Sequence, residues 1–414
     1  IYFNKNGGAW LSTAAMLSSG TVLNGVWNAT INHSLLGGVV TSDVIRYYVV
    51  TQGLNGNLGA NPVSGLVGVD VNNTTPPPSS SNQHTTLTSF SGNYNVGTGQ
   101  TYSSLTNAGG IFEAINAGSL TGNVTINITS DLTGELGTNA LNQWLEEGAG
   151  NYTLTIRPSG GPRTITGSNA GAFIRLFGAD RVTIDGSTTG ASAAACQVGG
   201  NPALRELTIQ NTNTSASAVV IAVMSGTNGA QNNTIRNVNI LGQDVGTLSI
   251  AGIAMGGNAP GTVGADNDNN RIENCSVKKA LYGIYSAGNS TANRDIGTTI
   301  IRNDLSASGA DRVRKVGILL FNTENALIHE NSVGGLQSSD AADAVGIGLG
   351  TQLVDNAMSG DNNVTNAVVS GNKINGVVST SATGFSAAGI AVYGGSNTLI
   401  NNMVTGVSSP ATSP

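Results

Sequence analysis

Few acidic and basic residues in this chain lie close enough in sequence to act together, and the best group is Asp180, Arg181 and Asp185. A lyase acting on an acidic polysaccharide needs carboxylates that hold calcium and an arginine or lysine that removes the proton beside the uronate. Sparse charges are also typical of turns and solvent-facing positions, and we favour that interpretation. Other cations that could face a groove are Lys278, Lys279, Arg302, Arg312, Arg314 and Lys315.

A glycoside hydrolase would instead need two or three carboxylates at one level of the fold. Asp340 and Asp343 are close in sequence, but the stretch around them has the composition of a loop. His329 is the only histidine in the C-terminal repeat region, and the sequence supplies no partner that would make it a base. We therefore assign no catalytic residue. A polysaccharide lyase or hydrolase, or a non-catalytic glycan binder using a groove, is the alternative function.

Oxygen-bearing side chains follow one another from Asp266 to Asn270, in the order Asp-Asn-Asp-Asn-Asn. Calcium loops present ligands at alternate positions, so Asp266 and Asp268 are candidate calcium ligands. The stretch lacks the glycine and the distal glutamate of an EF-hand loop. An ordinary Asn/Asp turn is therefore the favoured interpretation, and no other cofactor is expected.

Aromatic residues that could form a sugar-binding platform are scarce in the repeat region. The three tryptophans, Trp10, Trp27 and Trp144, all precede it. Four aromatic residues lie near successive repeats, and we expect them to pack within or between repeats rather than to bind sugar: Tyr282, Tyr285, Phe321 and Tyr393.

The element that must position all of these side chains is a repeat running from about residue 250 to the C-terminus. A Gly-Ile pair recurs inside a short apolar run, and a second apolar run follows it each time. Such units cannot bury their apolar face alone and must stack on one another. Short runs separated by Gly, Asn, Ser and Thr indicate strands, so the pattern predicts a right-handed parallel β-helix. Its inward column would be Ile253, Ile284, Ile318, Ile347 and Ile390.

Each second apolar run contains an asparagine followed by another apolar residue. Asparagine fits a bend between two faces because its side chain bonds to backbone and its backbone tolerates the left-handed region. We expect an asparagine ladder at equivalent corners of successive coils, made of Asn274, Asn303, Asn331, Asn372 and Asn402.

Helical spacing is found at one place before the repeats. Leu105, Ala108, Ile111, Phe112 and Ile115 recur at three- and four-residue intervals, with Gly118 as a stop signal. A helix here would cap the open N-terminal end of the β-helix, which would otherwise expose unpaired strand edges. A second short helix is expected near residues 139–147.

The chain divides by composition into four parts. Residues 1–72 read as alternating strands and predict a small antiparallel β-sandwich of immunoglobulin or fibronectin type, short enough to be incomplete. Residues 73–90 are rich in Pro, Ser and Thr and are expected to form a linker. Residues 91–408 are expected to form the capped β-helix. Residues 409–414 are expected to be a tail or linker to a further segment, so that the chain is a piece of something longer.

Composition excludes several classes of function. Charged residues are 10% of the chain and the net charge is −6, so the basic stripe that nucleic-acid binding requires is missing. No apolar run is long enough for a membrane-spanning helix. Cys196 and Cys275 belong to coils at least two rungs apart, beyond the reach of a disulfide, and are expected to be unpaired.

Three runs resemble a known family: Phe173 to Gly186, Leu207 to Asn213 and Asn232 to Asn237. They are similar to the pectin-lyase-like β-helix repeat proteins of Bacteroidetes. The strand around Tyr47–Val50 resembles the immunoglobulin-like modules found beside those repeats. The resemblance implies a secreted protein, often exported by type IX secretion, and it does not imply an activity.

The sequence therefore predicts an all-β structural or adhesive module of a large secreted bacterial surface protein. The expected location is extracellular or at the cell surface. Expected partners are copies of the chain itself, through head-to-tail contact or strand addition in a fibre, or surface glycans.

Overall fold

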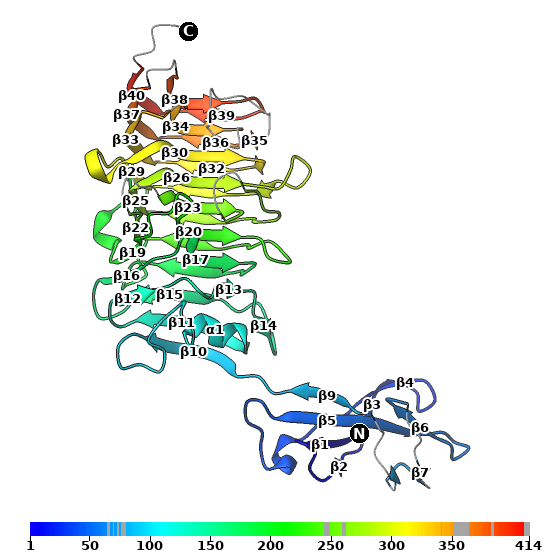
Figure 1. Cartoon of the computed structure of the whole chain (residues 1–414). Helices are drawn as coiled ribbons and strands as arrows, with labels where there is room; N and C mark the ends of the chain where they lie inside the picture. Colours follow the sequence, from blue (N-terminus) through cyan, green and yellow to red (C-terminus); the bar gives the residue numbers. More distant parts are fainter. Residues whose placement is uncertain are drawn as a thin grey trace. The chain divides into compact units, whose positions relative to one another are not determined.

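The computed structural model describes the chain apart from residues 64–66, 69, 73, 76–79, 244–248, 259–261, 341, 351–363, 382–384 and 410–414. It separates into two compact units, Ile1–Thr88 and Ser89–Pro414 (Figure 1). The predicted linker residues 76–79 and tail residues 410–414 lie outside the described part. No helix in the described part has the length and apolar character needed to cross a membrane.

The first unit is built on an antiparallel sheet in the order β2-β1-β5-β6, with β9 also pairing with β5. Phe3, Ile45 and Tyr48 form its buried centre, and Tyr2 stacks on Tyr48 with ring centroids 5.0 Å apart. The strands are β1 (Tyr2–Lys5), β2 (Leu11–Ser12), β5 (Val44–Gln52), β6 (Leu58–Asn61) and β9 (Asn82–Thr85), with hairpins of β3 (Met16–Gly20) and β4 (Gly25–Asn28), and of β7 (Val67–Gly68) and β8 (Thr74–Thr75), and a 3-10 turn η1 (His33–Leu36).

Strand β9 falls inside the segment 73–90 that we predicted to be a linker. Its residues pair with β5 from Val44↔Thr85 to Tyr47↔Asn82. The backbone N–H and C=O groups on this edge of β5 therefore pair with a polar stretch whose composition alone suggests a linker.

The second unit is a parallel β-solenoid of three long sheets, which we call the first, second and third sheets in the order the chain visits them in each coil. The first sheet contains β10 (Ser89–Val96), β11 (Ser119–Ile128), β15 (Leu154–Pro158), β18 (Val182–Asp185), β21 (Thr234–Arg236), β24 (Arg271–Glu273), β28 (Thr299–Ile301), β32 (Leu327–His329), β36 (Val368–Ser370) and β39 (Thr398–Ile400), with β14 (Leu145–Glu146) beside β11. The second contains β12 (Leu132–Glu135), β16 (Arg163–Gly167), β19 (Leu207–Asn211), β22 (Val238–Leu241), β25 (Ser276–Lys278), β29 (Asp304–Leu305), β33 (Ser332–Ser338), β37 (Lys373–Ser379) and β40 (Met403–Ser408). The third contains β13 (Leu141–Asn142), β17 (Ala172–Phe177), β20 (Val219–Met224), β23 (Ser249–Gly256), β26 (Ala280–Ala287), β30 (Val313–Phe321), β34 (Ala344–Leu349) and β38 (Ala387–Val392).

Smaller elements lie between these sheets. A short three-stranded sheet connects the third sheet back to the first and contains β27 (Asp295–Ile296), β31 (Thr323–Glu324) and β35 (Val364–Thr365). The 3-10 turns are η2 (Pro202–Leu204) and η3 (Gly309–Asp311), and the α-helix is α1 (Ile111–Asn116).

The predicted isoleucine column is confirmed. Ile253, Ile284, Ile318, Ile347 and Ile390 pair in register along the third sheet, and the column continues downward through Ile221 and Ile174. From Ile174 to Ile347 these side chains are almost fully buried in one continuous core. Full burial of such a side chain stabilises the fold by about 1.5–3 kcal/mol. The isoleucine column therefore stabilises the stacking of each coil on the next.

The glycine that precedes each of these isoleucines has a packing role. A methyl group built on Gly283 or Gly317 would come within 3.0 Å of Leu305 or Val333 on the second sheet, and of the backbone oxygen of the next glycine in the column. Glycine therefore lets the third sheet approach the second closely enough for the Val and Leu side chains to fill the coil. This explains why the pair recurs as Gly-Ile.

The asparagine ladder is present but begins one coil later than predicted. The side-chain oxygen of Asn331 accepts from the backbone N–H of Asn303 at 2.9 Å, and the same contact joins Asn331 to Asn372 at 2.9 Å and Asn372 to Asn402 at 3.1 Å. The placement of Asn274 in this ladder was wrong. It lies one position earlier, in the left-handed region (φ 50°), in the column that Arg302 and Glu330 continue.

Helix α1 buries Ile111, Phe112 and Ile115 against the start of the solenoid. The second predicted helix, near residues 139–147, is wrong. That segment forms β13 and β14, which pair in parallel with β17 and β11. The pairing of β13 with β17 and of β14 with β11 outweighs the local helical preference of the stretch.

Candidate functional site

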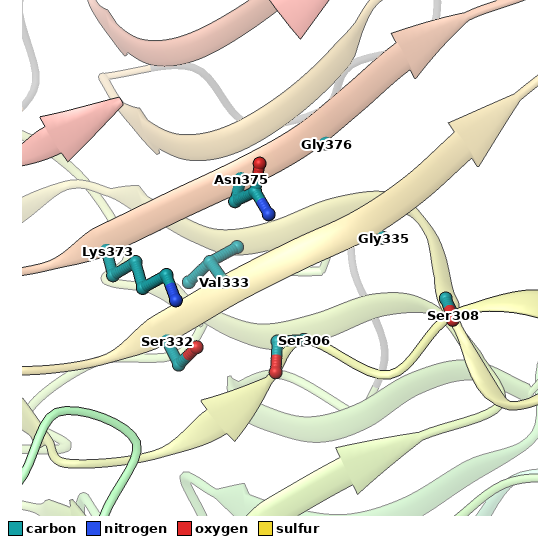
Figure 2. Close-up of a pocket in the computed structure, with 8 residues that line it drawn as sticks. All are labelled: Ser306, Ser308, Ser332, Val333, Gly335, Lys373, Asn375 and Gly376. Atoms are coloured by element: carbon teal, nitrogen blue, oxygen red, sulfur yellow. The ribbon is translucent and has the colours of Figure 1, made fainter. Parts of the chain in front are cut away.

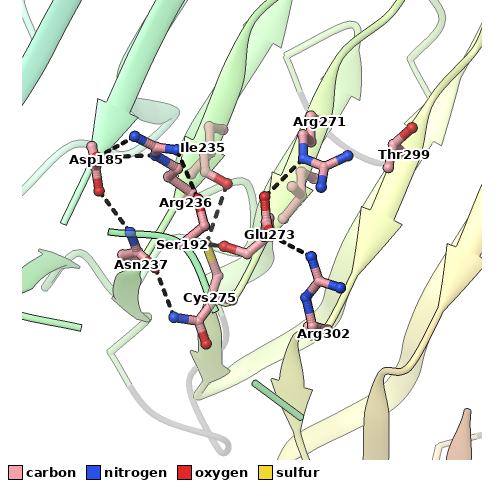
Figure 3. Close-up of polar contacts among 12 residues, drawn as sticks. Asp185, Ser192, Ile235, Arg236, Asn237, Arg271, Glu273, Cys275, Thr299 and Arg302 are labelled. Atoms are coloured by element: carbon pink, nitrogen blue, oxygen red, sulfur yellow. Dashed lines mark hydrogen bonds and ion pairs between the residues drawn. The ribbon is translucent and has the colours of Figure 1, made fainter. Parts of the chain in front are cut away.

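Charged side chains gather on the outer face of the first sheet, where Asp185, Arg236 and Glu273 are register neighbours on β18, β21 and β24 (Figure 3). The guanidinium of Arg236 donates to Asp185 Oδ2, with nitrogens at 2.7 and 2.9 Å. The other oxygen, Oδ1, accepts from the side chain of Asn237 at 2.7 Å and from the N–H of Ser187 at 3.0 Å. Both oxygens of this buried carboxylate are therefore occupied.

Glu273 lies between two arginines, as Figure 3 shows. Arg271 donates to one carboxylate oxygen at 2.8 Å and Arg302 to the other at 2.6 Å, and Arg302 also reaches Glu330 at 3.4 Å. Burial by itself would raise the pKa of Glu273, but the hydrogen bonds from Arg271 and Arg302 outweigh it and hold the pKa below its ordinary value. We call these residues the charge ladder: Asp185, Arg236, Arg271, Glu273, Arg302 and Glu330.

The charge ladder is arranged for stability rather than for proton transfer. A general base needs a lone pair directed at substrate, whereas Asp185 and Glu273 direct theirs at guanidinium groups. Within the described residues, no group of three or more His, Cys, Asp or Glu side chains is placed to hold a metal ion. The arrangement therefore supplies ion pairs between coils.

A long loop between β18 and β19, residues 186–206, runs beside the charge ladder, and we call it the strap. Its Gly199 N–H donates to the carbonyl of Glu330 at 2.8 Å. At its C-terminal end, Arg205 donates to the carbonyl of Asn274 at 3.0 Å and lies 3.7 Å from Asp304. The strap thus ties the coil of β18 to the coils two, three and four rungs later. Sequence reasoning missed it, although twenty-one residues between two strands of one coil were a usable signal.

The first predicted group is brought together only in part: Arg181 lies 3.9 Å from Asp180, and Asp185 contacts neither of them. Arg181 pairs with Glu146 at 2.7 Å, and Asp180 accepts from the N–H of Gln231 at 2.8 Å, whereas Asp185 belongs to the charge ladder. Desolvation by burial raises the pKa of Asp180, against the hydrogen bond from Gln231 and the charge of Arg181. The three residues therefore face two separate environments.

The remaining cations lie around the corner between the second and third sheets, apart from Arg302. Lys278 and Lys279 both lie 3.6 Å from Asp311, and Arg314 donates to both oxygens of Asp340 at 2.9 and 3.1 Å. Two further cations have other contacts: Arg312 donates to the carbonyl of Gly309 at 2.8 Å, and the Lys315 ammonium lies 5.7 Å from the ring centroid of Tyr282. Asp343 accepts from the N–H of Ser386 at 2.7 Å, whereas Asp340 is held by Arg314, so these two carboxylates have different partners.

The candidate calcium ligands sit at a turn between the third and first sheets. Asp266 is exposed with φ 59°, and Asp268 accepts from the N–H of Ile296 at 2.7 Å. The next coil adds Asp295, which is fully buried and whose Oδ1 accepts from the N–H of Asn267 at 3.0 Å. Calcium binding at Asp266 and Asp268 stays a prediction, which a calcium titration of the melting temperature would test.

Asp295 is an unusual group that the sequence did not single out. Its Oδ2 has no hydrogen-bond partner among the described residues. Burial raises its pKa to about 8, and the negative charges of Asp268 and Asp266 add to the effect. The carboxyl therefore holds its proton at neutral pH.

The predicted aromatic residues pack rather than form a platform. Tyr282 and Tyr285 are buried in an apolar layer on the outer side of the third sheet, with ring centroids 6.2 Å apart, and Phe321 belongs to the same layer. Burial raises the pKa of Tyr393 to about 12. His329 contacts the hydroxyl of Ser370 at 2.8 Å and Glu330 at 3.5 Å.

A hollow of about 350 Å³ opens on the outer face of the second sheet (Figure 2). It lies over β29, β33 and β37, where Gly335 and Gly376 adopt left-handed backbone angles (φ 63° and 76°) and bend the strands. Its lining residues are Ser306, Ser308, Ser332, Val333, Gly335, Lys373, Asn375 and Gly376.

Comparison with known proteins identifies no family. No family model matches the chain, and no curated protein matches it. Among solved structures, the chain is similar to one described as "Crystal structure of alginate lyase from Paenibacillus sp. str. FPU-7", with 17% identity and a TM-score of 0.27, over 69% of this chain and 91% of that chain. A resemblance of this size carries no information on activity.

Proposed function

We propose that this chain is a structural or adhesive module of a large secreted bacterial surface protein, acting outside the cell or at its surface. The observation that carries the proposal is the internal order that repeats from coil to coil in the described part of the solenoid. One isoleucine column and one asparagine ladder run through successive coils, and charged side chains on the outer face are bonded between coils. These features stabilise a stiff repeat. The carboxylate oxygens of Asp185 and Glu273 accept hydrogen bonds from neighbouring side chains, so they are not directed at a substrate.

Two finer features belong to the proposal. Helix α1 acts as the N-terminal cap of a solenoid whose coils wind right-handed, as parallel crossover connections almost always do. What supports the cap is the burial of Ile111, Phe112 and Ile115 beside β11 and β13. The first unit is an immunoglobulin-like sandwich, and the antiparallel sheet around β5 with its additional hairpins supports this assignment.

Self-association through the ends of the solenoid is the proposed route to a fibre. Among the described residues, the first sheet begins at β10 and ends at β39, and each of these strands pairs with one other strand. The last coil also leaves apolar side chains exposed, with Leu399 at 45% and Val404 at 44%. Unpaired strand edges beside exposed apolar residues favour strand addition by another copy.

The module proposal is tested on the whole 414-residue chain. We expect the solenoid to resist trypsin at 37 °C for hours, because most of its described arginines and lysines lie in hydrogen-bonded strands or ion pairs. Light scattering and electron microscopy should show end-to-end species whose proportion rises with protein concentration. Rapid digestion into small peptides would contradict the module role, and a strictly monomeric chain at all concentrations would contradict the fibre.

The enzymatic alternative makes a different prediction. A lyase produces unsaturated uronates, and a hydrolase produces new reducing ends. Incubation of the chain with acidic and neutral polysaccharides, with and without calcium, should yield neither product. Appearance of either, lost in a variant of one charge-ladder carboxylate such as Glu273→Gln, would replace the structural proposal with an enzymatic one.

A further inference from the structure

The hollow on the second sheet holds more free donors than free acceptors. Lys373 and Asn375 lie two residues apart on β37 and project from the same face, as Figure 2 shows. Both side chains are exposed, and the Lys373 ammonium has no acceptor among the described residues. The Asn375 oxygen already accepts from the Thr405 hydroxyl at 2.9 Å, which leaves its NH₂ group to donate outward.

The opposite wall supplies hydroxyl groups. Ser306 donates its hydroxyl proton to Asp304 at 2.6 Å, so the Ser306 oxygen presents lone pairs toward the hollow. Asp304 itself is held by Arg205 of the strap at 3.7 Å, which reduces its repulsion of an anion. Ser308, and Ser332 beside Lys373 on the adjacent strand β33, add two further hydroxyls.

The floor of the hollow is shaped by glycine. Gly335 and Gly376 occupy adjacent strands, and their left-handed angles make the bend that lowers the surface between the two walls. A hollow of about 350 Å³ is at the lower end of the range for small-ligand sites, which runs from about 300 to 1,000 Å³. It has room for about one or two sugar rings.

We propose that this hollow binds an acidic glycan through a single uronate residue. The carboxylate pairs with the Lys373 ammonium and the Asn375 NH₂ group, and the ring hydroxyls bond to Ser306, Ser308 and Ser332. A ligand with one carboxylate beside several hydroxyls matches one ammonium, one amide donor and three hydroxyls set around a polar floor. The site is non-catalytic, because none of its described lining residues is a carboxylate and the neighbouring Asp304 is bonded to Ser306 and paired with Arg205.

The proposal is tested by calorimetric titration of the 414-residue chain with the trisaccharide of galacturonic acid. Galactotriose is the neutral counterpart, and inorganic phosphate is the probe for a simple anion site. Lys373→Met keeps the apolar stem and removes the charge. Lys278→Met is the control, because Lys278 is a partly exposed lysine of the same sheet that lies beside Asp311 and does not line the hollow. Melting temperatures of both variants confirm that they fold.

We expect saturable binding of the uronate trisaccharide, weakened about tenfold by Lys373→Met and less than about twofold by Lys278→Met, as expected for loss of one charge-assisted hydrogen bond. Lys373→Arg should retain binding. Absence of saturable binding, equal loss in both methionine variants, or equal affinity for galactotriose would overturn the proposal. Competition by phosphate at the same concentration as the trisaccharide would reduce it to a simple anion site and also overturn it. None of these outcomes changes protease resistance, so the module proposal stands or fails separately.

Discussion

Cys275 occupies the position in its coil that Asn303 occupies in the next, and its backbone N–H donates to the Asn303 side-chain oxygen at 2.8 Å. Its thiol lies 3.5 Å from the carbonyl of Ile235. In the following coil, the Asn303 NH₂ group donates to the equivalent carbonyl, that of Ile272, at 3.0 Å. Cys275 is thus the first member of the ladder column, with sulfur in place of an amide. Both cysteines are free, as predicted, and burial raises the pKa of the Cys275 thiol to about 12.

Removing a ladder residue should be costly. Asn331→Ala leaves the N–H of Asn303 and the carbonyl of Ile300 without their partners inside the coil. Each buried unsatisfied group costs about 1–3 kcal/mol, so we expect a loss of about 3 kcal/mol in urea denaturation. Asn228→Ala, on an exposed loop, is the control and should cost less than about 0.5 kcal/mol. Similar losses in the two variants would show that the ladder is not a stabilising element.

Extending the ladder by one residue should be tolerated. In Cys275→Asn, the new NH₂ group would reach the Ile235 carbonyl that the thiol now faces. We expect the urea midpoint to stay unchanged or to rise, because a weak sulfur contact becomes an amide hydrogen bond. A destabilisation as large as that of Asn331→Ala would mean that the coil around Cys275 differs in shape from the later coils.

Gly317 tests the packing of the third sheet on the second. The methyl group of Gly317→Ala would collide with Val333 and with the carbonyl oxygen of Gly346. Overpacking of this kind costs about 1–3 kcal/mol. Gly171→Ala is the control, since its nearest neighbour would be the Asn169 side chain at 3.5 Å. Adding Val333→Ala to Gly317→Ala should recover part of the loss in a double-mutant cycle, and full additivity would contradict the contact.

The sequence was sufficient for features that repeat in register and insufficient for those that depend on one coil. The Gly-Ile pairs identified the inward column because spacing and residue type agree in every coil. The prediction for Asn274 was wrong because it matched asparagines by residue type alone. The register that pairs Ile272 with Ile300 places Cys275 at the position of Asn303 in the ladder. Asp295 gave no signal, since an aspartate in a turn is ordinary until the next coil covers it.

The two buried acids should respond to pH in opposite directions. Glu273 has a lowered pKa, so its ion pairs with Arg271 and Arg302 stabilise the fold fully above the unfolded value of 4.5 and are lost as the pH falls through the folded value. Glu273→Gln should therefore destabilise the chain by about 1–2 kcal/mol at neutral pH, and its effect should shrink as the pH falls below 4.5. A pH-independent loss would indicate packing rather than charge.

Asp295 should make the wild-type chain less stable as the pH rises. In the unfolded chain this carboxyl ionises near its ordinary pKa of 3.8, whereas in the folded chain it keeps its proton to about pH 8. Between these values the unfolded state releases a proton that the folded state retains, so the free energy of unfolding falls with pH, and the fall ends above about pH 8.

Asp295→Asn cannot ionise, and its amide oxygen can still accept from the Asn267 N–H. Urea midpoints at about pH 5, 7 and 9 should therefore be flatter for Asp295→Asn than for the wild type, with the variant more stable at pH 9 by on the order of a few kcal/mol. Asp268→Asn offers a second check: it removes one of the charges that raise the Asp295 pKa, so the decline should end at a lower pH. Parallel pH profiles for wild type and Asp295→Asn would show that Asp295 is ionised in the folded chain.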